Sequence, residues 1–175
     1  MENNLRNLDL SNNKISTLPQ NIGNFKMMKT LTMSKNKINM IPEDIGKMSK
    51  LENLNLSFNL LQSIPSSFQK LKHLREVCLS HNQISSFPQS LLNLKQLNVL
   101  DLAHNKITEV PAAAAKLEAT ELVLNCNQVS LIAPEVSQCP RLKTLRLEEN
   151  CLALDSIPTS LLSERWVANT ISATT

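Results

Sequence analysis

The chain has 175 residues, of which 42% are apolar and 19% charged, so its composition is that of one folded domain or repeat array rather than a disordered chain. Its net charge of +3 is too small for the concentrated basic face of nucleic-acid binders, and we expect no nucleic-acid partner. Aromatic residues make up only 3% of the chain, so the core is expected to consist of stacked aliphatic side chains.

The N-terminus has no charged segment followed by an apolar one, and no apolar run approaches the roughly 18 residues that a membrane helix needs. The sequence therefore predicts neither a secreted chain nor direct membrane insertion. Cys78, Cys126, Cys139 and Cys151 do not cluster at either end, unlike the cysteine-rich caps of secreted repeat proteins. We interpret them as reduced thiols and predict a cytoplasmic or nuclear location.

One pattern of apolar residues recurs along the chain, beginning near residues 5, 28, 51, 74, 97, 119 and 142. Successive starts lie 23, 23, 23, 23, 22 and 23 positions apart. Self-similarity at a fixed period of this length is typical of a solenoid, in which each coil buries its apolar face only against its neighbours. We therefore predict one domain of seven stacked coils over residues 1–162.

Each coil begins with a segment that has the periodicity of a strand. In the third coil, Asn55 alternates with Leu54 and Leu56, so successive side chains point to opposite sides. Seven such segments predict a parallel sheet whose outward residues form a concave face.

An asparagine recurs where each coil must leave its strand. Its amide has donors and acceptors for the free backbone groups of the turn and of the adjacent coil, so the predicted role is a structural ladder. The members of this slot are Asn13, Asn36, Asn59, Asn82, Asn105, Asn127 and Asn150.

A proline follows an apolar residue on the return side of the first five coils, at positions 19, 42, 65, 88 and 111. Proline fixes φ and has no N–H to satisfy, so this convex side is predicted to be extended or briefly helical. Gly23 and Gly46 follow two of these prolines, and we interpret both as tight corners rather than a phosphate-binding loop.

The sixth and seventh coils depart from the pattern. Ala119 replaces the leading leucine, Pro134 comes one place late, and two additional residues precede Pro158. We expect these changes to loosen or bulge the convex side. Residues 163–175 fit neither a coil nor a cap, and we predict a divergent, poorly ordered tail.

The repeat LxxLxLxxNxL, followed by proline and by an apolar residue three positions later, resembles the intracellular, Ras-related class of leucine-rich repeats. The resemblance covers Leu5 to Leu162 and is most specific at LDLSNNKI (8–15) and PRLKTLRLEENCL (140–152). It implies an α/β horseshoe solenoid that acts as a protein–protein interaction module, an intracellular scaffold or adaptor in signal transduction, with no cofactor.

The members of that class most similar to this chain begin with a glycine-initiated leader that looks like a myristoylation signal. This chain begins Met1-Glu2, so lipid anchoring does not carry over to its own residues. An alternative function is therefore a membrane-associated signalling adaptor whose lipidated leader is absent here. Because an array needs polar caps at both ends, we also expect a fragment or an alternatively spliced form.

The outward residues form two columns across the predicted concave face. The first column is Asp9, Thr32, Asn55, Cys78, Asp101, Val123 and Arg146. The second, at the strand ends, is Asn12, Lys35, Phe58, His81, His104, Cys126 and Glu149. A central aromatic group with a polar surround is typical of a binding hot spot, although single exposed apolar residues are also common. We predict that an unidentified protein partner contacts Asn55, Phe58, Cys78, His81, Asp101, His104 and Arg146.

Two alternatives use the same face. Cys78, His81, His104 and Cys126 are a legitimate set of zinc ligands, but they would have to converge on an open sheet. Catalysis is disfavoured because an open face does not exclude water and no triad is apparent, so we predict no enzyme and no small-molecule substrate. Lys14, Lys35, Lys37 and Lys106 are interpreted as a solvated rim, or as guidance for an acidic partner.

Overall fold

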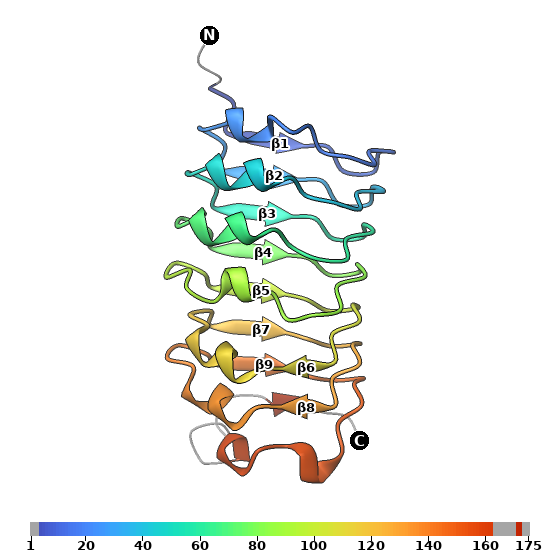
Figure 1. The fold of residues 1–175 in the computed structure, drawn as a ribbon, viewed down its shortest axis with the longest axis vertical. Helices are drawn as coiled ribbons and strands as arrows, with labels where there is room; N and C mark the ends of the chain where they lie inside the picture. The colour runs from blue at the N-terminus through green and yellow to red at the C-terminus, as the bar shows by residue number, and fades with distance from the viewer. Residues whose placement is uncertain (1–3, 163–170, 173–175) are drawn as a thin grey trace.

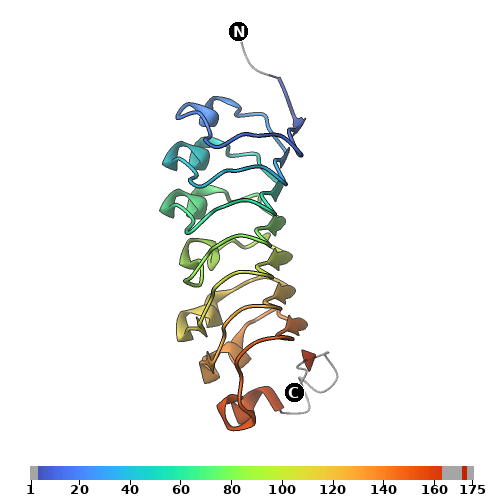
Figure 2. The same ribbon diagram turned by 90° about the vertical axis from the view of Figure 1, so that its right-hand side faces the viewer.

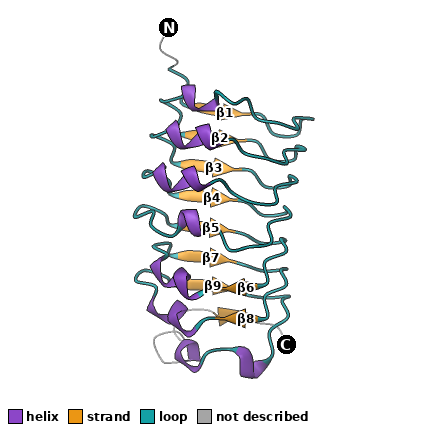
Figure 3. Cartoon of the chain, in the orientation of Figure 1, coloured by secondary structure: helices purple, strands orange, loops and turns teal. Residues whose placement is uncertain are grey.

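The computed structural model of the chain describes residues 4–162 and 171–172. The described coils stack along one axis as a solenoid, with the N-terminal end at one extreme (Figure 1). Strands line one side of the stack and short helical turns line the other (Figures 2 and 3). This is the predicted α/β solenoid with a parallel sheet.

One parallel sheet runs along the whole stack, in the order β1-β2-β3-β4-β5-β7-β9-β10. From β1 to β9, each strand pairs with the equivalent segment of the next coil, as Leu8 with Leu31 and Leu100 with Leu122. The register of the sheet is therefore that of the sequence repeat, including its shorter step between β5 and β7. The bounds are β1 (Asn7–Asp9), β2 (Thr30–Thr32), β3 (Asn53–Asn55), β4 (Glu76–Cys78), β5 (Val99–Asp101), β7 (Glu121–Val123), β9 (Thr144–Arg146) and β10 (Ile171–Ser172).

The strand β10 pairs with β9 through Ile171 and Leu145. It is the only described part of the predicted tail at 163–175, and the other residues of that prediction lie outside the described residues.

The return side contains short 3₁₀ helices joined by extended backbone, which confirms the expectation of extended or briefly helical backbone. Each of the prolines Pro42, Pro65, Pro88 and Pro111 directly precedes a 3₁₀ helix. A small sheet of β6 (Glu109–Val110) and β8 (Leu131–Ile132) lies on the same return path. The helices are η1 (Ile22–Asn24), η2 (Glu43–Lys47), η3 (Ser66–Lys70), η4 (Gln89–Leu91), η5 (Ala112–Lys116), η6 (Pro134–Gln138), η7 (Leu154–Ser156) and η8 (Thr159–Leu162).

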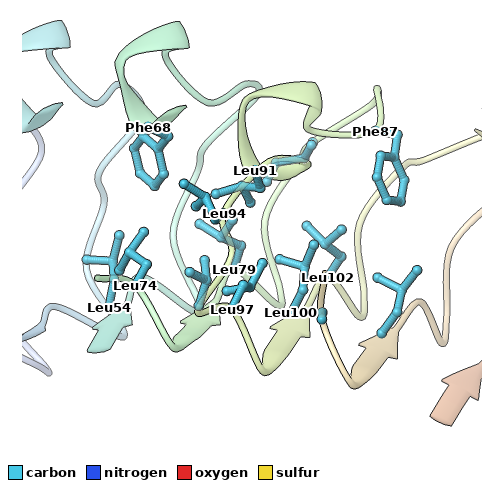
Figure 4. Packing of buried hydrophobic residues seen from close by; sticks show 14 of the residues in the cluster. Leu54, Phe68, Leu74, Leu79, Phe87, Leu91, Leu94, Leu97, Leu100 and Leu102 are labelled. Carbon is cyan, nitrogen blue, oxygen red and sulfur yellow. The ribbon is translucent and has the colours of Figure 1, made fainter. Parts of the chain in front are cut away.

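The core is a continuous stack of aliphatic side chains between the sheet and the return side (Figure 4). Leu54, Val77 and Leu100 occupy the same slot in three successive coils, and each is at most 2% exposed. Phe68 and Phe87 enter from the return side and are 0% and 5% exposed. Each layer is therefore covered by the layers before and after it.

The recurrent asparagines form the predicted ladder. The Asn82 Oδ1 accepts the Leu61 N–H of the preceding coil at 2.9 Å, and its Nδ2 donates to the Leu56 carbonyl at 3.0 Å. The same Nδ2 also donates to Leu79 and Ser80 in its own turn. One buried amide thus satisfies backbone groups of two coils.

The glycine corners arise from contact between coils. A Cβ on Gly46 would lie 2.7 Å from the Ser67 Cβ and 2.8 Å from the Ser67 carbonyl oxygen. A Cβ on Gly23 would lie 2.3 Å from the Asp44 carbonyl oxygen. Both glycines let adjacent 3₁₀ turns approach closely.

The last coils accommodate their irregularities locally. Ala119 is fully buried, and Pro134 begins η6 instead of preceding it. The segment before Pro158 forms the additional turn η7, in which Leu154 is 80% exposed.

Candidate binding face

A shallow hollow lies over the middle of the parallel sheet. Its volume is about 440 Å³. It is lined by outward residues from both ends of β2 to β5, namely Thr30, Thr32, Asn53, Asn55, Glu76, Cys78, Val99 and Asp101, with Leu54 and Val77 beneath them. The face is thus mainly polar, with carboxylates from Glu76 and Asp101.

The first predicted column holds its polar groups in place through local hydrogen bonds. The Asn55 Oδ1 accepts from the Ser57 N–H at 3.0 Å and from the Ser57 hydroxyl at 2.8 Å. Two coils further on, the Asp101 Oδ1 accepts from the Ala103 N–H at 3.0 Å. The side chains are therefore oriented before any ligand arrives.

Cys78 lies on β4, between these two residues, and its thiol links β4 to β5 through a hydrogen bond. Its thiol is 3.3 Å from the Asp101 Oδ2, to which it donates, and 3.3 Å from the Ser80 hydroxyl. Burial raises the pKa of Cys78, and the Asp101 carboxylate acts in the same direction. The thiol form is thus favoured over the nucleophilic thiolate.

The second predicted column lies beside the strands rather than on their ends. The strands β1 to β5, β7 and β9 have three residues each, and this column lies three positions after the last residue of each of them, in a left-handed turn. The φ values of its members lie between 53° and 57°, for Asn12, Lys35, Phe58, His81, His104, Cys126 and Glu149. Outside this column, no other described residue has a positive φ. The prediction of strand-end positions was wrong, because the chain turns inward toward each asparagine.

The identical turns bring three rings into one stack. The ring centroids of Phe58 and His81 are 3.9 Å apart with an interplanar angle of 11°. Those of His81 and His104 are also 3.9 Å apart, with an angle of 13°. Phe58 is 45% exposed, so the stack presents ring edges to solvent. We call Phe58, His81 and His104 the ring stack.

Within this column, charged side chains lie on either side of the ring stack. The Lys35 Nζ lies 5.8 Å from the centroid of the Phe58 ring, at the reach of a cation–π contact. At the other end the Cys126 thiol donates to the Glu149 Oε2 at 3.3 Å. Burial raises the pKa of Cys126, and Glu149 raises it further.

His81 is the middle ring of the stack and is half-buried. Burial lowers the pKa of His81 below its ordinary value, and the neighbouring His104 lowers it further. The Asp101 carboxylate opposes both effects. The neutral imidazole is therefore favoured in the free protein.

The structure divides the predicted site residues into three places. Asn55, Cys78 and Asp101 line the hollow, and the ring stack lies beside it along the turns. Arg146 lies on β9, toward the C-terminal end of the sheet, where its Nε is 3.3 Å from the Glu121 Oε1. Its position is separated from the hollow by β7.

The zinc alternative has no geometric support. In the part of the chain that the structure describes, no three histidine, cysteine or acidic side chains are placed to hold a metal ion. Cys78 and Cys126 instead contact the carboxylates of Asp101 and Glu149.

Four further lining residues escaped the sequence analysis. Thr30, Asn53, Glu76 and Val99 occupy the first position of their strands and face the hollow. Strand alternation could have identified them, since each comes two residues before a member of the first column.

The fold and this face define a class: a repeat solenoid that presents an open, preorganised sheet surface. The chain belongs to the leucine-rich repeat family. The family model, described as Leucine rich repeat, matches residues 3–61, 26–84, 49–107 and 73–121, which overlap across most of the chain.

Solved structures of similar fold come from several sources. A plant peptide hormone receptor, RGFR1 in complex with RGF2, is 32% identical over 90% of this chain and 26% of that chain, with a TM-score of 0.78. The ectodomain of the receptor kinase GASSHO1/SCHENGEN3 from Arabidopsis thaliana, in complex with CASPARIAN STRIP INTEGRITY FACTOR 2, is 26% identical over 86% of this chain and 19% of that chain, with a TM-score of 0.76.

A protein of Leptospira interrogans, LIC12759, is 26% identical over 97% of this chain and 49% of that chain, with a TM-score of 0.72. The chain therefore spans less than half of the length of these matched chains, from 19% to 49%. A separate observation concerns membranes: among the described residues, no helix is long and apolar enough to cross one.

Proposed function

We propose that this chain is a protein-interaction module that holds a segment of a protein partner on its concave sheet face. The observation that carries the proposal is the combination of the hollow over β2 to β5 with the ring stack beside it. Central aromatic groups in a polar surround are typical of interface hot spots. Asn55, Cys78 and Asp101 would supply oriented polar contacts.

Similar proteins support this reading. RGFR1 was solved in complex with RGF2, and PEPR1 was solved with AtPEP1. Both structures share the fold of this chain. Leucine-rich repeat domains generally mediate protein–protein interaction, and a frame of this kind accepts many different outward residues. The proposed cellular role is an intracellular scaffold or adaptor of the Ras-related class, active in signal transduction in the cytoplasm.

A site-specific photo-crosslinker tests the binding face. Placed at Asn55 or Phe58 of the full chain in cells, it should give a discrete crosslinked protein. The same crosslinker at Met40, which is 57% exposed on the return side, is the matched control. The double variant Phe58→Ala with His81→Ala should abolish capture while the melting curve stays cooperative. Equal crosslinking from Met40, or unchanged capture by the double variant, contradicts the proposal.

A further inference from the structure

A second surface borders the ring stack on the outer side of the asparagine ladder. From the second coil onward, the residue after the asparagine donates its backbone N–H to the preceding coil, as Lys37 to Ile15 at 2.9 Å and Lys106 to Ile84 at 2.8 Å. These positions therefore form a regular column parallel to the ring stack. Lys14, Lys37 and Lys106 belong to it, and their side chains are exposed. We call this column and the ring stack, together with Lys35, the turn edge.

The turn edge carries positive charges that no acidic side chain within it neutralises. Elsewhere, Lys29, Lys47 and Lys95 form ion pairs with Glu52, Asp44 and Glu118. Within the described residues, by contrast, Lys14, Lys35, Lys37 and Lys106 form no ion pair. Neither the second predicted column nor the column that follows the asparagines holds an acidic residue before Glu149 in the seventh coil. An acidic ligand on the first five coils would thus meet cations and no carboxylate in these columns.

The two histidines add a charge that depends on the ligand. His81 contacts His104 in the ring stack and is influenced by the Asp101 carboxylate, while Cys126 follows His104 in the column. A carboxylate laid along the ring edges would favour the imidazolium form of His81, which burial and the neighbouring His104 disfavour in the free protein. Binding would then take up protons, so affinity would rise as pH falls.

These observations carry one inference, which rests on the proposed binding function and specifies its ligand. We propose that the turn edge of the first five coils binds an extended, acidic segment of the protein partner. The columns place cations at coils one and two and at coil five, with the ring stack between them. Coils about 4.8 Å apart put Lys35 and Lys106 roughly 14 Å from each other along the axis, a span that about four extended residues cover.

Nucleic acid is a poorer fit to the same surface. Bases bind single-strand readers by stacking on free aromatic faces. Here the ring faces cover one another at 3.9 Å, and Lys35 lies over the Phe58 ring. The facing surfaces between the three rings are therefore closed to a stacking base.

An anionic membrane is also a poorer fit. A flat surface would contact the full length of the turn edge and would meet Glu149 as well as the lysines. A short peptide can occupy the first five coils alone. The charge pattern therefore favours a peptide.

Fluorescence anisotropy with the full chain and three labelled hexapeptides tests the inference. The probes share two central alanines, flanked on both sides by glutamates, by glutamines or by lysines. We expect only the glutamate peptide to bind, with an affinity that increases about tenfold from about pH 7.5 to about pH 5.5, on either side of the ordinary histidine pKa. The His81→Gln/His104→Gln variant should lose most of this pH dependence, whatever its affinity at the higher pH.

Two variants of equal charge separate specific binding from general attraction. Lys35→Gln/Lys37→Gln should weaken binding about fivefold, since each exposed ion pair contributes modestly. Lys70→Gln/Lys72→Gln removes two exposed lysines near the return-side helix η3 and should leave binding unchanged. Equal loss in both variants overturns the inference.

Vesicles containing phosphatidylserine provide the remaining comparison. Binding to vesicles without binding to the glutamate peptide overturns the inference in favour of a lipid surface. Absence of both, alongside crosslinking from Phe58 as described above, overturns the acidic-segment inference alone and leaves the proposed interaction function intact.

Discussion

The imidazole rings of His81 and His104 lie 3.9 Å apart, centroid to centroid, and their planes are 13° from parallel. The two residues are 23 positions apart in sequence and occupy the same left-handed turn of adjacent coils. The solenoid thus converts a sequence period into direct contact between titratable groups.

The contact predicts a pH dependence of stability. The folded-state pKa of His81 lies below the ordinary value of 6.5, so the unfolded chain binds the proton more readily. The associated stability is fully present above about pH 6.5 and is lost as pH falls through the folded-state pKa. Urea unfolding at about pH 7.5 and about pH 5.5 should show this loss, and it should be smaller in His81→Asn.

His73→Asn is the control for that experiment. Its ring lies elsewhere, with Nδ1 2.8 Å from the Ser49 carbonyl oxygen, and it is not part of the ring stack. This variant should keep the pH dependence of the unmodified chain. An identical pH dependence in His81→Asn would contradict the assignment.

The asparagine ladder predicts that the stability lost when an asparagine is replaced by alanine depends strongly on which coil it occupies. Asn82→Ala leaves the Leu61 N–H and the Leu56 carbonyl without their buried partner, so it should lower the free energy of unfolding by about 3 kcal/mol. Asn13 is exposed, and the hydrogen bonds described for its side chain go only to Leu10 and Ser11 in its own turn. Asn13→Ala should therefore cost no more than about 1 kcal/mol. Denaturant titration of the two variants gives the comparison, and equal losses would contradict it.

Much of the fold is visible in the sequence because the slots have different physical requirements. Leu54 must be apolar to fill a layer, and Asn82 must both donate and accept hydrogen bonds. Proline fits at position 65 because it fixes φ and leaves no backbone N–H to satisfy. Repetition of such demands once in every coil defines the sheet register. The spacing alone places His81 beside His104.

The left-handed conformation of the second column could not be predicted. Asn12, His81 and His104 belong to residue types that are enriched at positive φ, whereas Lys35 and Phe58 normally avoid it. The turn is imposed by the inward path toward each asparagine. Contacts across coils, such as that of Gly46 with Ser67, were equally hidden because they depend on backbone separation.

The close approach at Gly46 predicts a steric defect. In Gly46→Ala the new Cβ would lie 2.8 Å from a backbone oxygen of Ser67, so the adjacent turns must separate. We expect a loss of about 1–3 kcal/mol in the free energy of unfolding. Adding Ser67→Gly removes the Cβ contact at 2.7 Å but leaves the carbonyl contact, and should restore part of the loss. No loss in the single variant would show that the turns are not tightly packed.

The four cysteines should differ in their reaction with iodoacetamide. Cys151 is exposed and should react first, whereas Cys139 is 0% exposed and should react last. Burial raises the pKa of Cys78 and of Cys126, which reduces their thiolate fraction and slows their alkylation. Mass spectrometry of timed samples gives the order. In denaturant the four rates should converge, and a fast Cys139 in the folded chain would contradict the buried position.

The left-handed turns predict that substitutions at Lys35 differ in stability because of backbone conformation and not only because of side-chain contacts. Lys35 has a φ of 55°, a conformation that asparagine tolerates and a β-branched residue resists. Lys35→Val and Lys35→Asn both remove the ammonium group from the Phe58 ring, so their difference isolates the backbone effect. We expect Lys35→Val to be less stable than Lys35→Asn by about 1–2 kcal/mol in urea unfolding. At Lys37, which is exposed and lies outside the positive-φ set, valine should show no such disadvantage. An equal difference at both positions would mean that side-chain preference, rather than the turn, is responsible.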